Sequence, residues 1–298
     1  MKAQANGIEI EYETFGEPTN PAVLLIMGLA AQLTRWPMPF VEDLVARGYF
    51  VIRYDNRDIG LSTKFDDAPV PALPALIGAM MTGQKPDVPY TLNDMAADAV
   101  GLLDALDIRR AHVMGASMGG MIAQLVAATY PDRVLSLTSI MSSTGNPGLP
   151  PSKPDAMEVL MSRPTSGDRE AAIAHGIRTE RVIGSPGHPV EESVLRTRVE
   201  RDFDRMHYPA GAGRQLAAVV SNGDRRAAIA AIKAPTMVIH GADDPLVPVE
   251  AGRDTAANIA GAEITEVPGM GHNLPEALIP TVLDAFEKVA RRAEAPAS

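Results

Sequence analysis

The most informative stretch of this sequence is Gly115-Ala116-Ser117-Met118-Gly119-Gly120. It follows an apolar run at 111–116 that predicts a buried strand, and it opens a segment with helical spacing at 118–129. A serine in a tight strand-to-helix turn has a strained backbone, and the flanking glycines leave room for neighbouring segments of chain. Its hydroxyl oxygen then projects over the sheet, where the free N–H groups of the following helix can stabilise an oxyanion. The motif in this setting predicts a nucleophile, whereas a chance match would mark only a turn.

Strands and helices alternate on both sides of this turn. Short apolar or alternating runs predict strands, the first of them at a sheet edge, at 8–13, 22–27, 50–54, 111–116, 134–141, 236–240 and 262–267. Helical spacing predicts helices at 40–47, 92–106, 118–129, 250–259 and 275–292. Thr91 and Asp94 resemble a capping box at the start of the second helix. This order predicts an α/β protein with a mainly parallel central sheet flanked by helices.

The alternation breaks between 142 and 234, where prolines separate mixed polar helices. We interpret this segment as an inserted, mostly helical cap. The expected core domain therefore comprises 1–141 and 235–298, and the expected cap or lid domain comprises 142–234.

The composition limits the class of protein. With 298 residues, of which 46% are hydrophobic and 21% charged, the chain is long enough for one large α/β domain. Its formal net charge of −10 disfavours nucleic acid as a partner. The sequence has no cysteine, and its acidic pairs lack histidines at metal-binding spacing, so we expect neither a metal nor a cofactor. No apolar run near the N-terminus is long enough for a membrane span, and we expect a cytoplasmic protein.

Partners for the serine lie further along the chain, because a hydroxyl needs an adjacent base to act as a nucleophile. His272 lies in a glycine-flanked loop, 268–273, between the last expected strand and the last helix. Asp243 and Asp244 occupy a turn after the strand 236–240, and this position alone leaves either of them as the acid. For the remaining histidines we prefer a surface or packing role: His112, His175, His188, His207 and His240.

An oxyanion needs N–H donors. One is the N–H of Met118, the residue after the candidate nucleophile. The other is expected from a loop after an early strand, where Met27-Gly28-Leu29-Ala30 lies, and the N–H of Leu29 is the candidate. In the alternative interpretation, Gly28 is only a turn residue.

These residues together resemble the α/β-hydrolase superfamily. The blocks 27–29, 51–62 and 268–272 look most like the branch that contains aclacinomycin methylesterase. Many relatives carry His-Gly where this chain has Met27-Gly28, so a histidine that braces the oxyanion loop is absent. We interpret the charged segment 53–62 as salt bridges that hold a turn beside the site.

The resemblance implies an α/β-hydrolase fold and a catalytic triad. The family's nucleophile, acid and base fall on Ser117, Asp244 and His272, and its oxyanion amides on Leu29 and Met118. A serine hydrolase that cleaves small to medium carboxylic esters through an acyl-enzyme is therefore expected. Carbon–carbon bond hydrolases, lactonases and cofactor-free perhydrolases share the triad and stay open as alternatives, as does a non-catalytic ligand-binding protein.

The expected partner is a small-molecule ester, and the sequence leaves the oligomeric state open, a homodimer included. Flexible apolar side chains in the cap are candidates for contact with this substrate, together with Gly28 of the core: Met157, Leu160, Met161 and Met206. Packing of the cap helices onto the sheet explains these methionines equally well.

Overall fold

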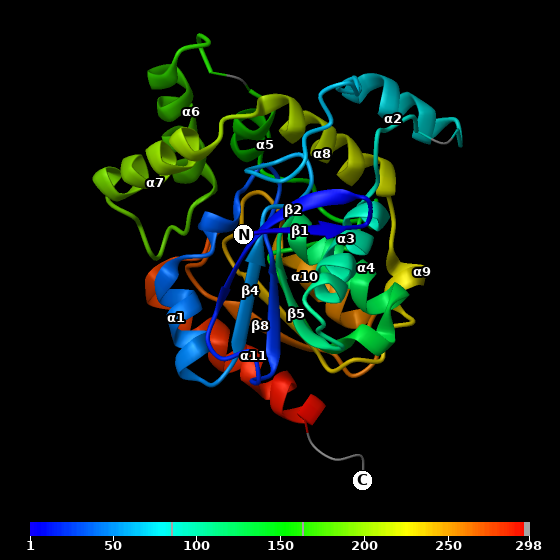
Figure 1. Cartoon of the computed structure of the whole chain (residues 1–298). Helices are drawn as coiled ribbons and strands as arrows, with labels where there is room; N and C mark the ends of the chain where they lie inside the picture. The colour runs from blue at the N-terminus through cyan, green and yellow to red at the C-terminus, as the bar shows by residue number, and fades with distance from the viewer. Residues whose placement is uncertain (85, 163, 295–298) are drawn as a thin grey trace.

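The computed structural model describes residues 1–84, 86–162 and 164–294. Within them the chain forms one eight-stranded sheet with the order β1-β2-β4-β3-β5-β6-β7-β8 (Figure 1). The pairs β1–β2 and β2–β4 are antiparallel and the other neighbours are parallel. The strands are β1 Lys2–Ala5, β2 Ile8–Phe15, β3 Ala22–Ile26, β4 Phe50–Tyr54, β5 Ala111–Ala116, β6 Val134–Ile140, β7 Thr236–Gly241 and β8 Glu263–Val267. The predicted α/β architecture with a mainly parallel sheet is confirmed.

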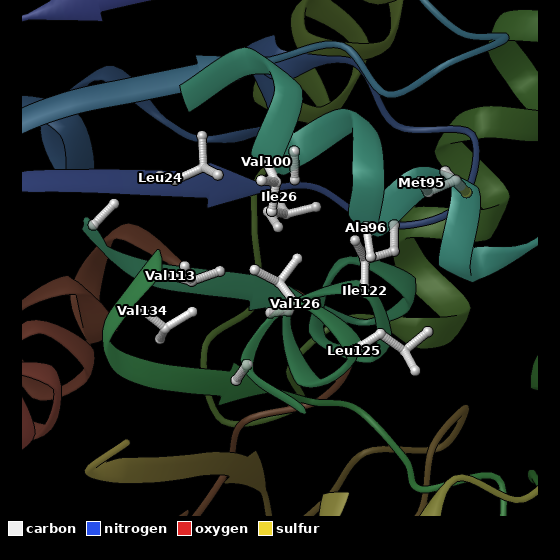
Figure 2. Close-up of a cluster of buried hydrophobic side chains, with 14 of the residues drawn as sticks. Leu24, Ile26, Met95, Ala96, Val100, Val113, Ile122, Leu125, Val126 and Val134 are labelled. Carbon is white, nitrogen blue, oxygen red and sulfur yellow. The ribbon is translucent and has the colours of Figure 1, made fainter. Parts of the chain in front are cut away.

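Helices cover both faces of the sheet, which explains why its central strands are buried along nearly their whole length. On one face, α4 packs against β3, β5 and β6 and α3 packs against β1, β2 and α4, and Figure 2 shows this cluster around Ile26, Val113 and Val126. On the other face, α1 and α11 enclose a second cluster that contains Trp36, Phe40 and Phe286. The helices outside the segment between β6 and β7 are η1 Leu33–Arg35, α1 Met38–Ala46, α2 Leu73–Met81, α3 Leu92–Ala105, α4 Met118–Thr129, η2 Pro131–Arg133, α10 Val249–Ala257, η3 Glu276–Leu278 and α11 Ile279–Glu294.

The capping box predicted at the start of α3 is confirmed. The Thr91 side chain accepts a hydrogen bond from the Asp94 N–H at 3.3 Å, and the Asp94 carboxylate accepts one from the Thr91 N–H at 2.7 Å. Two N–H groups that the first helical turn leaves without partners are thereby satisfied. None of the helices in the described ranges combines the length and the apolar character that crossing a bilayer requires.

The prediction that 8–13 forms an edge strand is wrong, because β2 lies between β1 and β4. Lys2–Ala5 pairs antiparallel with β2 through a hairpin in which Asn6 has φ +49° and Gly7 has φ +78°. An Asn-Gly pair favours this two-residue turn because both residues adopt positive φ at low cost. The stronger signal lay in that dipeptide, since the alternation in Lys2–Ala5 spans four residues and rests on two alanines.

A helical segment separates β6 from β7, and it lies at one end of the sheet (Figure 1). Its helices are α5 Pro154–Met161, α6 Arg169–Ile183, α7 Glu192–Arg205, α8 Pro209–Asn222 and α9 Arg226–Ile229. Helices α6 and α7 share a small hydrophobic cluster of their own, formed by Ile173, Ile177, Leu195 and Val199. The division of the chain into a core and a cap stays a prediction.

Candidate active site

The backbone of Ser117, between β5 and α4, adopts a conformation that is rare for a residue with a side chain, with φ +56° and ψ −121°. The glycines of the motif make this turn possible. A Cβ on Gly115 would lie 2.0 Å from the Gly119 carbonyl oxygen, and one on Gly119 would lie 2.1 Å from the Ile26 carbonyl oxygen. Since both obstacles are backbone atoms, only glycine fits at either position.

Ser117, His272 and Asp244 come together although they follow three different strands. The Ser117 Oγ lies 2.9 Å from His272 Nε2, and His272 Nδ1 lies 2.7 Å from Asp244 Oδ2. Asp244 is 5% exposed and His272 8%, while Ser117 is half-buried. The three side chains therefore form a continuous hydrogen-bonded series that is shielded from water at the acid and open at the serine.

The two neighbouring aspartates have different partners. The second oxygen of Asp244, Oδ1, accepts hydrogen bonds from the N–H groups of Leu246 and Val247 at 2.9 and 2.8 Å. Asp243 instead accepts a hydrogen bond from the Gly269 N–H at 2.8 Å and so braces the loop that carries His272. Of these two aspartates, it is Asp244 that touches the imidazole. In the ranges that the structure describes, no three His, Asp or Glu side chains are arranged to hold a metal ion.

His240 is a second histidine beside Asp244 that the sequence analysis assigned to packing. It is fully buried, and its Nε2 lies 2.8 Å from the Val247 carbonyl oxygen and 3.7 Å from Asp244 Oδ2. Because a carbonyl oxygen only accepts hydrogen bonds, Nε2 carries the proton. Burial lowers the pKa of His240, so the ring is neutral at pH 7. Its hydrogen bond to the Val247 carbonyl oxygen fixes the turn that follows Asp244.

The loop after β3 packs directly on the serine. A Cβ on Gly28 would lie 3.1 Å from the Ser117 Cβ, so the absence of a side chain allows this close approach. Leu29 follows in the loop, and Met118 is the first residue of α4, where the helix provides no acceptor for its N–H. Within the described part of the chain, neither the Leu29 nor the Met118 N–H donates a hydrogen bond.

Two polar side chains that the sequence analysis missed hold this loop. The Asn56 side chain donates to the Met27 carbonyl oxygen at 2.8 Å, and the Gln215 side chain accepts from the Ala30 N–H at 2.9 Å. They come from the loop after β4 and from α8, so their contacts join segments far apart in the sequence.

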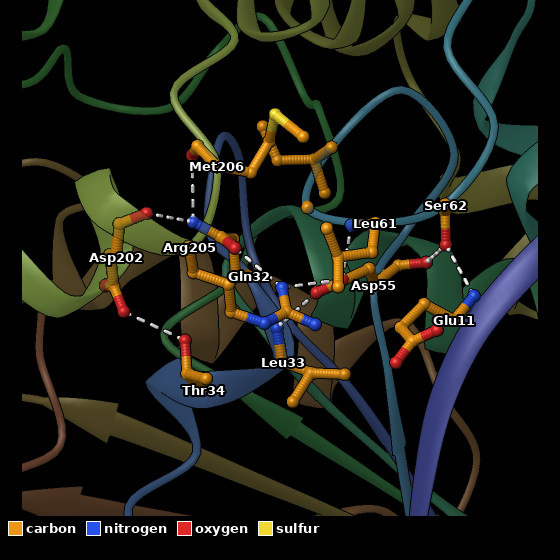
Figure 3. Close-up of polar contacts among 12 residues, drawn as sticks. Glu11, Gln32, Leu33, Thr34, Asp55, Leu61, Ser62, Asp202, Arg205 and Met206 are labelled. Carbon is orange, nitrogen blue, oxygen red and sulfur yellow. Dashed lines mark hydrogen bonds and ion pairs between the residues drawn. The ribbon is translucent and has the colours of Figure 1, made fainter. Parts of the chain in front are cut away.

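The charged segment 53–62 forms salt bridges, in agreement with its structural interpretation. Asp55 is fully buried and accepts hydrogen bonds from the N–H groups of Leu33 and Leu61, each at 2.8 Å, and from Arg205 at 2.7 Å (Figure 3). Burial raises the pKa of Asp55 against the opposing effect of Arg205 and the two N–H groups. Because Arg205 ends α7, this ion pair ties the inserted helices to the core.

A second ion pair of this kind joins α8 to the same segment. Arg214 binds both oxygens of Asp58, at 2.6 and 3.0 Å, and the two side chains are 2% and 0% exposed. Burial would raise the pKa of Asp58, but hydrogen bonds from Arg214, the Phe65 N–H and Tyr90 together lower it. Asp58 is therefore ionised and fully paired.

Two of the five candidate substrate contacts are largely exposed. Met157 is 42% and Met161 47% exposed, while Leu160 and Met206 are half-buried. A pocket of about 320 Å³ borders the loops that carry Asp243 and His272, but none of these four residues and no atom of Gly28 lines it. Their role in substrate binding stays a prediction.

The sequence profile of the family described as alpha/beta hydrolase fold matches residues 21–276. The chain belongs to this family. Rhodomycin D methylesterase DauP of Streptomyces sp. (strain C5) is 31% identical, over 89% of each chain. A 2-hydroxy-6-oxononadienedioate/2-hydroxy-6-oxononatrienedioate hydrolase of Paraburkholderia xenovorans (strain LB400) is also 31% identical, over 89% of this chain and 84% of that one. Among solved structures, the enol-lactonase of Burkholderia xenovorans LB400 superposes with a TM-score of 0.70 over 99% of both chains, at 25% identity.

Proposed function

We propose that this chain hydrolyses carboxylic esters of small molecules through a covalent acyl-enzyme, with Ser117 as nucleophile, His272 as base and Asp244 as the acid that orients the base. The observation that carries the proposal is the series of two short hydrogen bonds, Oγ to Nε2 at 2.9 Å and Nδ1 to Oδ2 at 2.7 Å. A serine hydroxyl within reach of an oriented imidazole is the arrangement that nucleophilic catalysis requires.

In the acylation half of the reaction, His272 Nε2 removes the Ser117 proton while Oγ attacks the ester carbonyl carbon. The resulting oxyanion binds the N–H groups of Leu29 and Met118, which donate to no other group in the described residues. Asp244 stabilises the imidazolium through Nδ1. When the tetrahedral intermediate collapses, His272 returns the proton to the leaving alkoxide, and the alcohol departs.

In the deacylation half, a water molecule takes the place of the alcohol. His272 removes a proton from this water, its oxygen attacks the acyl carbonyl, and the same two N–H groups hold the second oxyanion. Collapse breaks the bond between the acyl carbon and Ser117 Oγ. The serine recovers its proton from His272, and the carboxylic acid is released.

The relatives support ester hydrolysis and define its main competitor. Proteins named as methylesterases match nearly the whole chain at 31% identity, which favours an ester substrate. A hydrolase named for a 2-hydroxy-6-oxo-dienedioate matches it at the same identity, so cleavage of a carbon–carbon bond by the same three residues is the second candidate. We further propose that the segment 142–234 acts as the cap that selects the substrate. A homodimeric state and a cytoplasmic location stay predictions.

The test is hydrolysis of p-nitrophenyl esters from acetate to decanoate by the native protein, by Ser117→Ala and by Ser166→Ala, which removes an exposed serine far along the chain. We expect Ser117→Ala to lose up to about 10⁶ in kcat, as in other triads, and Ser166→Ala to keep native activity. Native rates in Ser117→Ala would refute the proposal. Turnover of a vinylogous diketone that requires Ser117, with no turnover of any ester, would favour the carbon–carbon hydrolase.

A further inference from the structure

The loop that carries Leu29 contains a turn that its own sequence does not favour. The Ala31 N–H donates to the Gly28 carbonyl oxygen at 3.3 Å, which closes a β-turn with Leu29 and Ala30 at its centre. Ala30 has φ +57°, whereas Leu29 does not have a positive φ. A positive φ at the second central position alone is the mark of a type II turn, where glycine is the preferred residue. Alanine is disfavoured there, because its Cβ crowds the backbone.

A buried glutamine holds the turn in this conformation. The Ala30 N–H, which the turn itself does not use, donates to Gln215 Oε1 at 2.9 Å. The other end of the same amide, Nε2, donates to the Arg57 carbonyl oxygen at 2.9 Å. Gln215 is fully buried, so its amide bridges two core loops from α8 with both ends satisfied.

The position of the glutamine is itself fixed. Its neighbour Arg214 is bound to both oxygens of the buried Asp58, which anchors α8 at this point. At the other end of the loop, Asn56 holds the Met27 carbonyl oxygen. The Gly28–Leu29 peptide, whose N–H donates no hydrogen bond within 1–84, 86–162 and 164–294, lies between these two supports.

The alternative to a type II turn is a type I turn, in which the peptide between the two central residues is rotated by about half a turn. That rotation would give Ala30 a negative φ, which an alanine prefers. It would also turn the Ala30 N–H away from Gln215 and leave a buried amide oxygen without a donor, which is costly. Gln215 therefore selects the conformation that the Ala30 side chain disfavours.

We propose that Gln215 is a positioning residue: it fixes the Leu29–Ala30 peptide and so keeps the adjacent Gly28–Leu29 peptide, which carries the oxyanion N–H, in place for the reacting carbonyl. The inference rests on the proposed function, since it concerns the oxyanion of that reaction. Gln215 acts through the Ala30 N–H and does not touch the substrate. The helix α8, inserted between β6 and β7, thereby takes part in organising the site on the core.

The test compares Gln215→Leu with Gln124→Leu, which removes another fully buried glutamine, on α4, that binds the Ser139 hydroxyl and not the loop. We expect Gln215→Leu to lose about tenfold or more in kcat, below the roughly 10²- to 10³-fold cost of deleting an oxyanion donor outright, with KM within about threefold. Gln124→Leu should stay within about twofold of native kcat.

A rescue separates positioning from a structural role. Because glycine adopts positive φ freely, Ala30→Gly added to Gln215→Leu should recover about half of the loss on a logarithmic scale or more. Asparagine is too short to bridge the Ala30 N–H and the Arg57 carbonyl, so Gln215→Asn should show the same loss and the same rescue. If Gln215→Leu does not fold, Gln215→Asn provides the test of the positioning role.

Native kcat in the Gln215 variants, or a loss that Ala30→Gly does not relieve, would overturn the inference. The proposed function would still stand in that case, provided that Ser117→Ala is inactive. Native hydrolysis by Ser117→Ala would overturn the proposed function first, and the inference with it.

Discussion

At the scale of single residues, the site divides into side chains that sequence motifs predict and side chains that they do not. Ser117 and His272 lie in short glycine-rich motifs, so their positions follow from local patterns. Asn56, Gln215 and His240 are ordinary polar residues in the sequence, and their contacts become visible only in the fold. No local pattern predicts a hydrogen bond between Ala30 and a residue 185 positions away.

The adjacent aspartates provide a matched pair of variants. Asp244→Asn should lower kcat by about 10⁴, because an amide cannot hold the imidazole tautomer or stabilise the imidazolium. Asp243→Asn should keep most of the activity, since the Asp243 side chain accepts from the Gly269 N–H and not from the imidazole. Steady-state kinetics on one ester measures both. Equal losses in the two variants would contradict the assignment of the acid.

His112 should make the fold sensitive to acid. Its ring lies 2.8 Å from the Ser136 hydroxyl, and burial lowers its pKa from 6.5 to about 4. The unfolded chain therefore binds a proton on His112 more tightly than the folded chain does. The contribution of the neutral His112 to the free energy of unfolding is fully present above pH 6.5 and declines as the pH falls towards 4. Over this pH range the free energy of unfolding falls by about 3 kcal/mol, because each unit of difference in pKa corresponds to about 1.36 kcal/mol.

Urea unfolding of the native protein and of His112→Gln at pH 7 and pH 4.5 measures this contribution. We expect the native protein to lose more stability than the variant between the two pH values. An identical loss in both would show that His112 is not the group responsible.

At the scale of elements, strands and helices with strong periodicity were predicted within a few residues, as β5 and α4 show. Elements that were not predicted include the helix α2 and the four-residue strand β1, which exists because the Asn6-Gly7 turn returns the chain onto β2. Pairing with a neighbour, and not its own pattern, makes it a strand. Boundaries also shifted where a short 3-10 turn precedes a helix, as η3 does before α11.

The capping box of α3 gives a prediction at this scale. Thr91→Ala should lower the free energy of unfolding by about 1 kcal/mol, because it removes the acceptor for the Asp94 N–H. Thr197→Ala, within the exposed face of α7, should change it by less than about 0.5 kcal/mol. Urea titration of both variants gives the comparison. An equal effect would mean that the capping box of α3 contributes nothing to stability.

At the scale of the whole molecule, buried ion pairs fasten the inserted helices to the core. Arg205 with Asp55 and Arg214 with Asp58 each join a helix between β6 and β7 to the loop after β4. The sequence showed that the segment 53–62 is charged, but not which arginines bind it. Those partners lie about 150 residues away, beyond the reach of any periodicity.

The Asp58–Arg214 ion pair should contribute more to the free energy of unfolding than an ion pair on the surface does. Arg214→Leu should cost about 3–5 kcal/mol, because it leaves a buried carboxylate without its cation. Arg253→Leu, which breaks an exposed pair with Glu266, should cost less than about 1 kcal/mol. Chemical denaturation of the two variants at pH 7 checks this, and a similar cost for both would refute the anchoring role of Arg214.

The most direct test of the central claim is the site of covalent modification by a fluorophosphonate, which reacts as an ester carbonyl does and stays bound. We expect one adduct for each chain, on the peptide that contains Ser117, formed in step with the loss of esterase activity and absent from Ser117→Ala. Complete inactivation with Ser117 unmodified, or hydrolysis that continues after Ser117 is fully labelled, would contradict the account.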